Sequence, residues 1–260
     1  MLPRSLKNKA LTSILELGCV FAFLFTMPVV AQEIAQEIAH NKMAHKVVRL
    51  QVGIALPPYV INKGNSGAEL DIIREALAFE GYRITLALRE TAKHDVMRVV
   101  SSGNELGGCY SKPYIFYRNV AISLSSRRLI VDGIGDLRGQ RVIGTSSAAE
   151  TLGVNFTNIL SDIKGFDEVL EVREQNVRLF NGQTDLVVGD INIFNWMVEN
   201  TELPNPVDSS QSIAVHPIFE PSPKYLLFRD PVICEAFNRG VERLEQSGRY
   251  QEILNAYGLF

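Results

Sequence analysis

The stretch QNVRLFNGQTDLVVGDINIFNWMVE, residues 175–199, places a strand between two helices. Gln175–Phe180 predicts a helix that stops at Asn181-Gly182, because Gly terminates helices readily. The apolar run Asp185–Val188 is typical of a buried strand, and Ile191–Glu199 predicts the helix that follows it. A strand enclosed by two helices in so short a stretch indicates helices layered over a sheet.

The same alternation continues on both sides of this stretch. Apolar runs predict further strands at Val47–Ile54, Arg83–Leu88, Asn119–Leu124, Arg141–Gly144, Ser212–Val215 and Tyr225–Phe228. Helical spacing predicts further helices at Asp95–Ser102, Ser147–Gly153, Val232–Gln246, Tyr250–Tyr257 and Leu70–Leu77, the last ending near Gly81. Strands that alternate with helices predict an α/β fold with mainly parallel sheets and right-handed connections. In such sheets a ligand binds at the carboxyl ends of the strands, beside helix N-termini.

The N-terminus has the three parts of a secretory signal peptide. A short basic segment comes first and contains Arg4, Lys7 and Lys9. An apolar stretch follows from Ala10 to Val30, and the small residue Ala31 precedes the polar Gln32. This order predicts a signal peptide at residues 1–31, cleaved after Ala31, and therefore export to the periplasm.

Two alternatives to a cleaved signal peptide are an uncleaved membrane anchor and a lipoprotein anchor. Glu16 and Gly18 interrupt the apolar stretch, which argues against a membrane-spanning helix. Leu17-Gly18-Cys19 resembles a lipobox, but Glu16 occupies a position where an apolar residue is wanted. Apolar residues also follow Cys19 in place of a polar tether. We therefore treat Cys19 as part of the segment that is removed.

The charge of the exported chain argues against polyanionic partners. The whole chain has 26 Lys and Arg against 29 Asp and Glu, and residues 1–31 hold three of the basic residues and one of the acidic residues. Their removal leaves a formal charge of −5, so we expect neither nucleic acid nor an anionic membrane surface as a partner. Residues 32–46 form a polar lead-in, and the remainder can form one large domain or two modest lobes.

The sequence contains no recognisable catalytic or metal-binding motif. Cys109 and Cys234 can form a disulfide in an oxidising compartment, or they can be two buried small hydrophobes. There is no Cys-x-x-Cys pair, no Gly-x-Ser-x-Gly elbow, no His-Glu-x-x-His and no Gly-x-x-x-x-Gly-Lys. We therefore expect no catalytic residue, no metal and no cofactor.

Several short segments occur in an order typical of one protein family. They are Pro57-Pro58-Tyr59, Gly67–Asp71, Ser111-Lys-Pro-Tyr114, Asp136–Val142, Asn181–Asp190 and the closing residues from Phe237 to Gly258. Together they resemble the bacterial extracellular solute-binding proteins of family 3, the polar amino-acid type. Ser111-Lys-Pro-Tyr114 resembles the family's Phe-Ser-x-Pro-Tyr segment, and Asn181–Asp190 its Gly-x-x-Asp-Ala-x-x-x-Asp segment. The resemblance covers the chain from about Val47 to Gly258.

The resemblance implies a type II periplasmic-binding-protein fold, with two α/β lobes joined by two crossovers. Lobe 1 is expected at residues 47–119 and 216–260, and lobe 2 at residues 120–215. The ligand is expected in the cleft between the lobes, buried when a hinge closes. The family delivers its ligands to ABC importers or, occasionally, to sensor proteins in the membrane. We expect a monomer.

Two candidate ligand-binding positions follow strands of the second lobe. Thr145 and Ser146 lie between a short strand and a helix, where hydroxyl and backbone N–H groups face an anion. Asp190 lies between the strand Asp185–Val188 and the next helix. The resemblance implies that Asp190 binds the ammonium of an amino acid by a charge-assisted hydrogen bond. Ordinary helix N-capping is the alternative at all three positions.

Two further candidates belong to the first lobe. The resemblance implies that the ring of Tyr59, on a loop stiffened by two prolines, covers the ligand side chain. The alternative is an ordinary surface or core tyrosine. Ser111 is expected to bind the ligand from the Ser-Lys-Pro-Tyr segment. By contrast, Glu69 and Asp71 are expected to form a helix-start pair, and Trp196 is expected to pack in the core of lobe 2.

The sequence departs from the family at one arginine. Family members carry a Thr-x-x-Arg segment before Phe-Ser-x-Pro-Tyr, and its guanidinium binds the ligand carboxylate. The segment between Met97 and Ser111 is too short to hold it. Arg118, close to the crossover, is the replacement candidate. This departure leaves the ligand open to other polar solutes.

Three functions remain possible at the level of sequence. The first is a solute-binding receptor. The second is an enzyme on the same scaffold, since a few relatives dehydrate cyclic acids such as prephenate or arogenate, but that chemistry needs a positioned acid or base. The third is a ligand-free protein that presents its lobes to a membrane sensor. Binding of small molecules would indicate the receptor, and turnover of prephenate would indicate the enzyme. Affinity for a membrane protein without binding of any small molecule would indicate the third function.

Overall fold

The computed structural model describes residues 46–51, 56–61, 65–87, 95–99, 107–146, 148–204 and 207–259. The predicted signal peptide at residues 1–31 and all of the lead-in except Lys46 lie outside the described residues. Within the described part of the chain, each helix is too short or too polar to cross a lipid bilayer.

The first sheet combines strands from both ends of the described chain. Its order is β2-β1-β3-β11-β4, and β5 pairs with β11 outside this path. The strands are β1 (Lys46–Gln51), β2 (Tyr82–Ala87), β3 (Val96–Val99), β4 (Cys109–Tyr110), β5 (Ile115–Tyr117) and β11 (Ser222–Phe228). The helices of this part are α2 (Ala68–Ala78), α7 (Pro231–Gln246) and α8 (Arg249–Ala256). Gly240 lets α7 approach α2 closely, because a Cβ there would lie 2.0 Å from the carbonyl oxygen of Ala76.

The second sheet comes from the middle of the chain, in the order β10-β6-β9-β7-β8. Its strands are β6 (Asn119–Leu124), β7 (Arg141–Thr145), β8 (Gly165–Val169), β9 (Leu186–Asp190) and β10 (Ile213–His216). Its α-helices are α3 (Ala148–Thr151), α4 (Val154–Thr157), α5 (Val172–Phe180) and α6 (Ile191–Asn200). Short 3-10 turns are η3 (Ser125–Arg127), η4 (Ile134–Leu137) and η5 (Leu160–Asp162).

Both faces of the second sheet are buried at its central strands β6, β7 and β9, which explains the nearly continuous apolar residues of these strands. Val187 packs in one cluster with Phe194 of α6, whereas its neighbours Leu186 and Val188 pack in another with Phe156 of α4. Successive side chains of a strand point to opposite faces, so a strand covered by helices on both sides needs apolar residues throughout.

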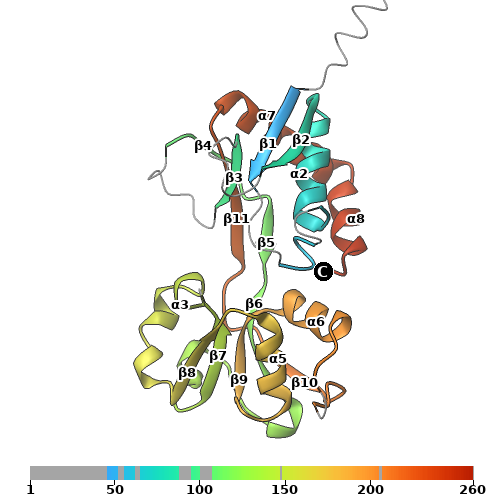
Figure 1. The fold of residues 1–260 in the computed structure, drawn as a ribbon. Helices are drawn as coiled ribbons and strands as arrows, with labels where there is room; N and C mark the ends of the chain where they lie inside the picture. The colour runs from blue at the N-terminus through green and yellow to red at the C-terminus, as the bar shows by residue number, and fades with distance from the viewer. Residues whose placement is uncertain are drawn as a thin grey trace, which may run out of the picture. The chain divides into compact units, whose positions relative to one another are not determined.

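The chain passes between the two sheets twice. Figure 1 shows the outward connection between β5 and β6 and the return between β10 and β11. The first sheet therefore takes its strands from residues 46–117 and 222–228, and the second from residues 119–216. The exact limits of the two predicted lobes stay a prediction.

The expectation of mainly parallel sheets is wrong, because both sheets are mixed. β1 runs parallel to β3, and β7 runs parallel to β8 and β9. In contrast, β11 pairs antiparallel with β3, β4 and β5, and β6 pairs antiparallel with β9 and β10. The antiparallel pairs all involve the strands next to the connections between the sheets, where the chain enters a sheet without a helical crossover.

The predicted helix Asp95–Ser102 is also wrong, because Val96–Val99 is the strand β3 in the interior of the first sheet. Its neighbours β1 and β11 pair with it on both sides. Asp95, just before the strand, accepts hydrogen bonds from the backbone N–H and the guanidinium of Arg49 at 2.8–3.0 Å. Pairing on both edges outweighs a helical pattern of only a few residues.

Smaller differences concern the ends of elements and one side chain. The predicted helix Ser147–Gly153 is the single turn α3, followed by the separate turn α4. The strands β4, β5 and β8 were not predicted, since two or three residues of β4 and β5 show no periodicity. Trp196, expected in the core, is only half-buried.

Cys109 and Cys234 form a disulfide with a Cα–Cα distance of 6.1 Å. The bond joins the short strand β4 to the first turn of α7, across 125 residues of sequence. Of the two alternatives that the sequence left open, the structure therefore contains the covalent one, which is typical of an oxidising compartment.

Candidate functional site

Tyr59 lies on a loop that is fastened to the start of α2. The backbone N–H groups of Ala68 and Glu69 donate to the carbonyl oxygens of Pro58 and Tyr59, both at 3.1 Å. These N–H groups belong to the first turn of the helix, where no partner exists within the helix itself. Gly67 permits this approach, because it has a φ of 123° and a Cβ there would lie 2.2 Å from the Tyr59 carbonyl oxygen.

The ring of Tyr59 is buried, with 1% of its surface exposed. It stacks on the ring of Tyr117, with centroids 4.0 Å apart and planes inclined by 16°. The Tyr117 hydroxyl donates to Oε1 of Glu69 at 2.7 Å, and Nζ of Lys224 lies 4.6 Å from the centroid of the Tyr117 ring. The stack fixes the direction in which the Tyr59 hydroxyl points.

The Tyr59 hydroxyl contacts Asp190, at the carboxyl end of β9 in the second sheet. The hydroxyl donates to Oδ2 of Asp190 at 3.0 Å and accepts from Nδ2 of Asn192 at 2.9 Å. Burial and the nearby Asp190 carboxylate raise the pKa of Tyr59, so its hydroxyl stays protonated. Ile193 of α6 also belongs to the apolar cluster that contains Tyr59. Polar and apolar contacts therefore join the loop of the first sheet to the start of α6.

Asp190 caps α6 and is almost fully buried. Its Oδ1 accepts from the N–H of Ile193 at 2.9 Å, and its Oδ2 also accepts from the N–H of Arg118 at 2.6 Å. Burial raises the pKa of Asp190, while hydrogen bonds from the backbone of Ile193, Arg118 and Asn192 and from Tyr59 counteract part of this effect. None of these partners is a cation.

Arg118 and Thr145 lie beside Asp190 at the same edge of the second sheet. Arg118 directly precedes β6, in which Asn119 pairs with Asp190, and its side chain is exposed. In the parallel pair β7–β9, Ile143 is opposite Val187. Continuation of this register places Thr145 level with the residue before Asp190, about 5 Å away. The edge thus combines a guanidinium, a hydroxyl and a carboxylate.

Two other predicted residues make local hydrogen bonds. The N–H of Ser146 donates to the carbonyl oxygen of Val169 at 2.9 Å, and the following helix α3 is a single turn. The hydroxyl of Ser111 donates to the carbonyl oxygen of Lys112 at 2.7 Å and accepts from the N–H of Leu226 at 2.9 Å. The structure therefore brings Tyr59, Arg118 and Asp190 into direct contact but gives the Ser111 hydroxyl a place between β4 and β11. The ligand roles of all six residues stay predictions.

The sequence did not assign three members of this network to the site. Asn192 is the second residue of α6, so its place after Asp190 was the signal that could have indicated it. Tyr117 is the last residue of β5 before the outward connection. Glu69, expected in a helix-start pair, does lie in the first turn of α2 and also accepts from the hydroxyls of Tyr114 and Tyr117.

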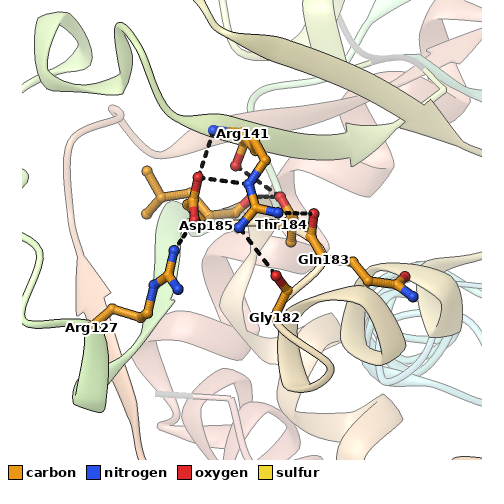
Figure 2. A network of polar contacts seen from close by, with 7 residues as sticks. Arg127, Arg141, Gly182, Gln183, Thr184 and Asp185 are labelled. Carbon is orange, nitrogen blue, oxygen red and sulfur yellow. Dashed lines mark hydrogen bonds and ion pairs between the residues drawn. The ribbon is translucent and has the colours of Figure 1, made fainter.

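A second polar network lies at the opposite end of β9. Figure 2 shows the side chains of Arg127 and Arg141 converging on Asp185, just before this strand. The guanidinium of Arg141 binds Oδ1 and Oδ2 of Asp185 at 2.8 and 3.1 Å and also the carbonyl oxygens of Gly182 and Gln183. Hydrogen bonding from Arg141 lowers the pKa of Asp185 to about 2. This network fixes the register of β7 and β9 beneath the edge that carries Asp190.

Groups suited to metal binding or nucleophilic catalysis are scarce in the described part of the chain. No set of three or more His, Cys, Asp or Glu residues there is placed to hold a metal ion. His216 lies 2.9 Å from the hydroxyl of Ser123, but Ser123 is 0% exposed. Burial lowers the pKa of His216, so the ring favours its neutral form at neutral pH. A fully buried serine cannot reach a substrate, and this pair joins β6 to β10.

Comparison with other proteins by sequence finds no matching family model and no matching curated protein. Comparison by structure finds extensive likeness. The chain is similar to the probable amino-acid ABC transporter extracellular-binding protein YtmK of Bacillus subtilis, with a TM-score of 0.66, 14% identity and coverage of 82% of this chain and 98% of the other.

Two solved complexes show the same likeness. One is the GluR0 ligand-binding core with L-glutamate, with a TM-score of 0.63, 16% identity and coverage of 82% of this chain and 99% of the other. The other is the amino acid ABC transporter substrate-binding protein AbpA of Streptococcus pneumoniae with L-arginine, with a TM-score of 0.59, 15% identity and coverage of 81% and 94%. At such identities the likeness establishes the fold, which is that of the type II periplasmic binding proteins.

Proposed function

We propose that this chain is a solute-binding receptor that captures a small polar ligand, an amino acid or a related compound, and delivers it to an ABC importer. The fold supports this proposal, because the similar structures include an amino acid ABC transporter substrate-binding protein with L-arginine and a ligand-binding core with L-glutamate. Fold alone does not assign function, so the proposal depends on the site.

The observation that carries the proposal is the meeting of Tyr59, Arg118 and Asp190. The three residues come from the first sheet's loop, the outward connection and the end of β9, and they meet through hydrogen bonds at Asp190. A residue set drawn from both sides of the connections is the arrangement that hinge closure needs in order to bury a ligand. Thr145 and the Arg118 guanidinium provide donors for a ligand carboxylate at the same edge.

In this proposal the receptor has no catalytic activity, and it acts as a monomer in the periplasm. The buried position of Ser123 supports the first point, because the Ser123–His216 pair offers no accessible nucleophile. The basic, apolar and small-residue order of residues 1–31 and the Cys109–Cys234 disulfide support export. The alternative partner is a membrane sensor protein, which would bind the closed, ligand-bound receptor in place of an ABC importer.

Thermal unfolding against a panel of solutes tests the receptor function. The protein, expressed from its full-length gene and purified, is heated with amino acids, small carboxylates, amines and sugars. A ligand at about a hundred times its Kd stabilises the folded state by about 2.7 kcal/mol. For a chain of this length, the Tm should rise by about 5–10 °C.

The same preparation supplies the controls. N-terminal sequencing should find Gln32 as the first residue, and incubation with prephenate should leave it unchanged. An Asp162→Ala variant, which alters only the exposed Arg138–Asp162 pair, should keep the full ligand-induced shift. A panel that produces no shift, or turnover of prephenate, contradicts the proposal.

A further inference from the structure

Oδ2 of Asp190 has no acceptor position left for a ligand. A carboxylate offers about four lone-pair positions to donors. Ile193 occupies one on Oδ1, while Arg118 and Tyr59 occupy both on Oδ2. The backbone N–H of Asn192 also stabilises the charged carboxylate. The protein itself therefore occupies three of about four acceptor positions on Asp190, the residue to which the resemblance assigns the ligand ammonium.

The Tyr59 hydroxyl is the one donor among these that comes from a side chain of the first sheet's loop. The other donors are backbone N–H groups that flank the start of β6 and the start of α6. A ligand ammonium can therefore bind Oδ2 of Asp190 only by displacing the Tyr59 hydroxyl. Displacement also removes the acceptor of the Asn192 amide, which donates to that hydroxyl at 2.9 Å.

The position of this hydroxyl is built into the structure and is costly to change. Tyr59 is 1% exposed and stacks on Tyr117, which Glu69 holds through a hydrogen bond of 2.7 Å. Gly67 holds the backbone of the same loop against α2. A ligand that moves the ring would leave buried polar groups unpaired, and such groups carry the full penalty of lost hydration.

We propose that the Tyr59 hydroxyl sets the ligand class of this receptor by occupying the ammonium position at Asp190. The chain then selects solutes that carry carboxylate or hydroxyl groups and lack a free ammonium group. Such a solute leaves the Tyr59–Asp190 bond intact and takes its hydrogen bonds from the Arg118 guanidinium and the hydroxyl groups of the same edge. This inference rests on the proposed receptor function and narrows its ligand from amino acids and related compounds to those related compounds that lack an ammonium group.

Pairs of ligands that differ only at one group test the inference. Isothermal titration compares L-alanine with L-lactate, L-aspartate with L-malate and L-glutamate with L-2-hydroxyglutarate. In the wild-type protein, the hydroxy acid of the best-binding pair should bind at least tenfold more tightly than the amino acid. Tyr59→Phe keeps the stacked ring and frees one position on Asp190, so affinity for the amino acid should rise at least tenfold.

Two further variants keep the test independent of folding defects. Asn192→Ala loosens the Tyr59 hydroxyl without touching the ring, and it should shift the preference several-fold in the same direction. Tyr114→Phe is the matched control, because Tyr114 is equally buried and its hydroxyl also donates to a carboxylate, that of Glu69 at 3.1 Å. It should leave the ratio of the two affinities unchanged.

The outcomes separate this inference from the receptor function. A wild-type preference for the amino acid of a pair, or weaker amino-acid binding by Tyr59→Phe, overturns the inference and leaves the receptor intact. The absence of binding by all compounds to both proteins overturns the receptor function and the inference together. A preference for the hydroxy acid that reverses in Tyr59→Phe and persists in Tyr114→Phe supports both.

Discussion

Asp185 and Asp190 lie at the two ends of β9, but they have different kinds of hydrogen-bond partner and opposite pKa shifts. Asp185 is bound by the guanidinium groups of Arg127 and Arg141, and its pKa is lowered to about 2. Asp190 is bound by backbone N–H groups and the hydroxyl of Tyr59, and burial raises its pKa. The same residue type, in the same sequence segment, therefore has two different roles.

The difference lies in the kind of partner. Cations compensate the charge of Asp185, so its ion pairs can hold β7 and β9 in register without any other group. Neutral donors satisfy the lone pairs of Asp190 without compensating its charge fully, and one of these donors comes from the loop of the first sheet. The protonation of an aspartate of the second kind depends on its surroundings, as is common for residues at functional sites, whereas the ion pairs of Asp185 keep that residue charged.

The largest effect is expected from Asp185→Ala, which removes the anchor. The substitution leaves two arginines and the N–H of Arg141 without their shared partner, in a place where 10% of the Asp185 side chain is exposed. We expect the free energy of unfolding to fall by about 2–4 kcal/mol. Thermal unfolding should show a Tm lower by about 5–15 °C.

Asp162→Ala is the control for this variant, because Asp162 also pairs with an arginine but about half of each side chain is exposed. An exposed pair contributes about 1 kcal/mol at most. Equal losses of stability in Asp185→Ala and Asp162→Ala would show that the Asp185 network is an ordinary surface pair and would remove one side of the comparison.

A smaller loss of stability, with a loss of binding, is expected from Asp190→Ala. The variant loses the cap of α6 and leaves the N–H groups of Arg118 and Ile193 without their acceptor. We expect unfolding to cost about 1–3 kcal/mol less than in the wild type. The protein should stay folded at 25 °C and lose its ligand-induced rise in Tm, because Asp190 holds the Tyr59 hydroxyl and the backbone of Arg118 beside the proposed ligand position. A variant that keeps the full rise would place the ligand away from the residues that Asp190 holds, Tyr59 and Arg118.

The two aspartates also show how far the sequence could predict this molecule. The strand and helices around Asn181–Asp190 were predicted with ends within a few residues, because apolar runs and an Asn-Gly stop are local signals. The order of the motifs predicted the fold, which the structural likenesses confirm. The strand β3 was missed, since its identity depends on pairing with β1 and β11 and not on its own four residues.

The site was predictable only in part. Position after a strand and before a helix indicated Asp190, and two prolines indicated a stiff loop at Tyr59. Nothing in the sequence placed the hydroxyl of Tyr59 on the carboxylate of Asp190, because 131 positions separate them and only the folded chain brings them together. Only the folded chain likewise shows that the buried Ser111 hydroxyl donates to the carbonyl oxygen of Lys112 and accepts from the N–H of Leu226.

The smallest expected effect is a difference in how the stability contributions of Asp185 and Asp190 depend on pH. This difference tests the contrast between the two aspartates most directly. The pKa of Asp185 in the folded state, about 2, is below its ordinary value of 3.8. Its contribution to stability is therefore present above about pH 4 and is lost as the pH falls from about 4 to about 2. The pKa of Asp190 lies above 3.8, so the folded protein holds this proton more tightly than the unfolded chain. The contribution of Asp190 to the free energy of unfolding must therefore decrease as the pH rises above 3.8.

Urea unfolding of the wild type, Asp185→Asn and Asp190→Asn between pH 3 and pH 7 measures both contributions. The stability advantage of the wild type over Asp185→Asn should shrink toward acid, because protonation of Asp185 abolishes its ion pairs. The advantage over Asp190→Asn should instead be largest in acid and shrink toward neutral pH, because a buried carboxylate without a cation is costly when charged. If both differences changed with pH in the same direction, Asp190 would be a second anchor, and the distinction between the two ends of β9 would fail.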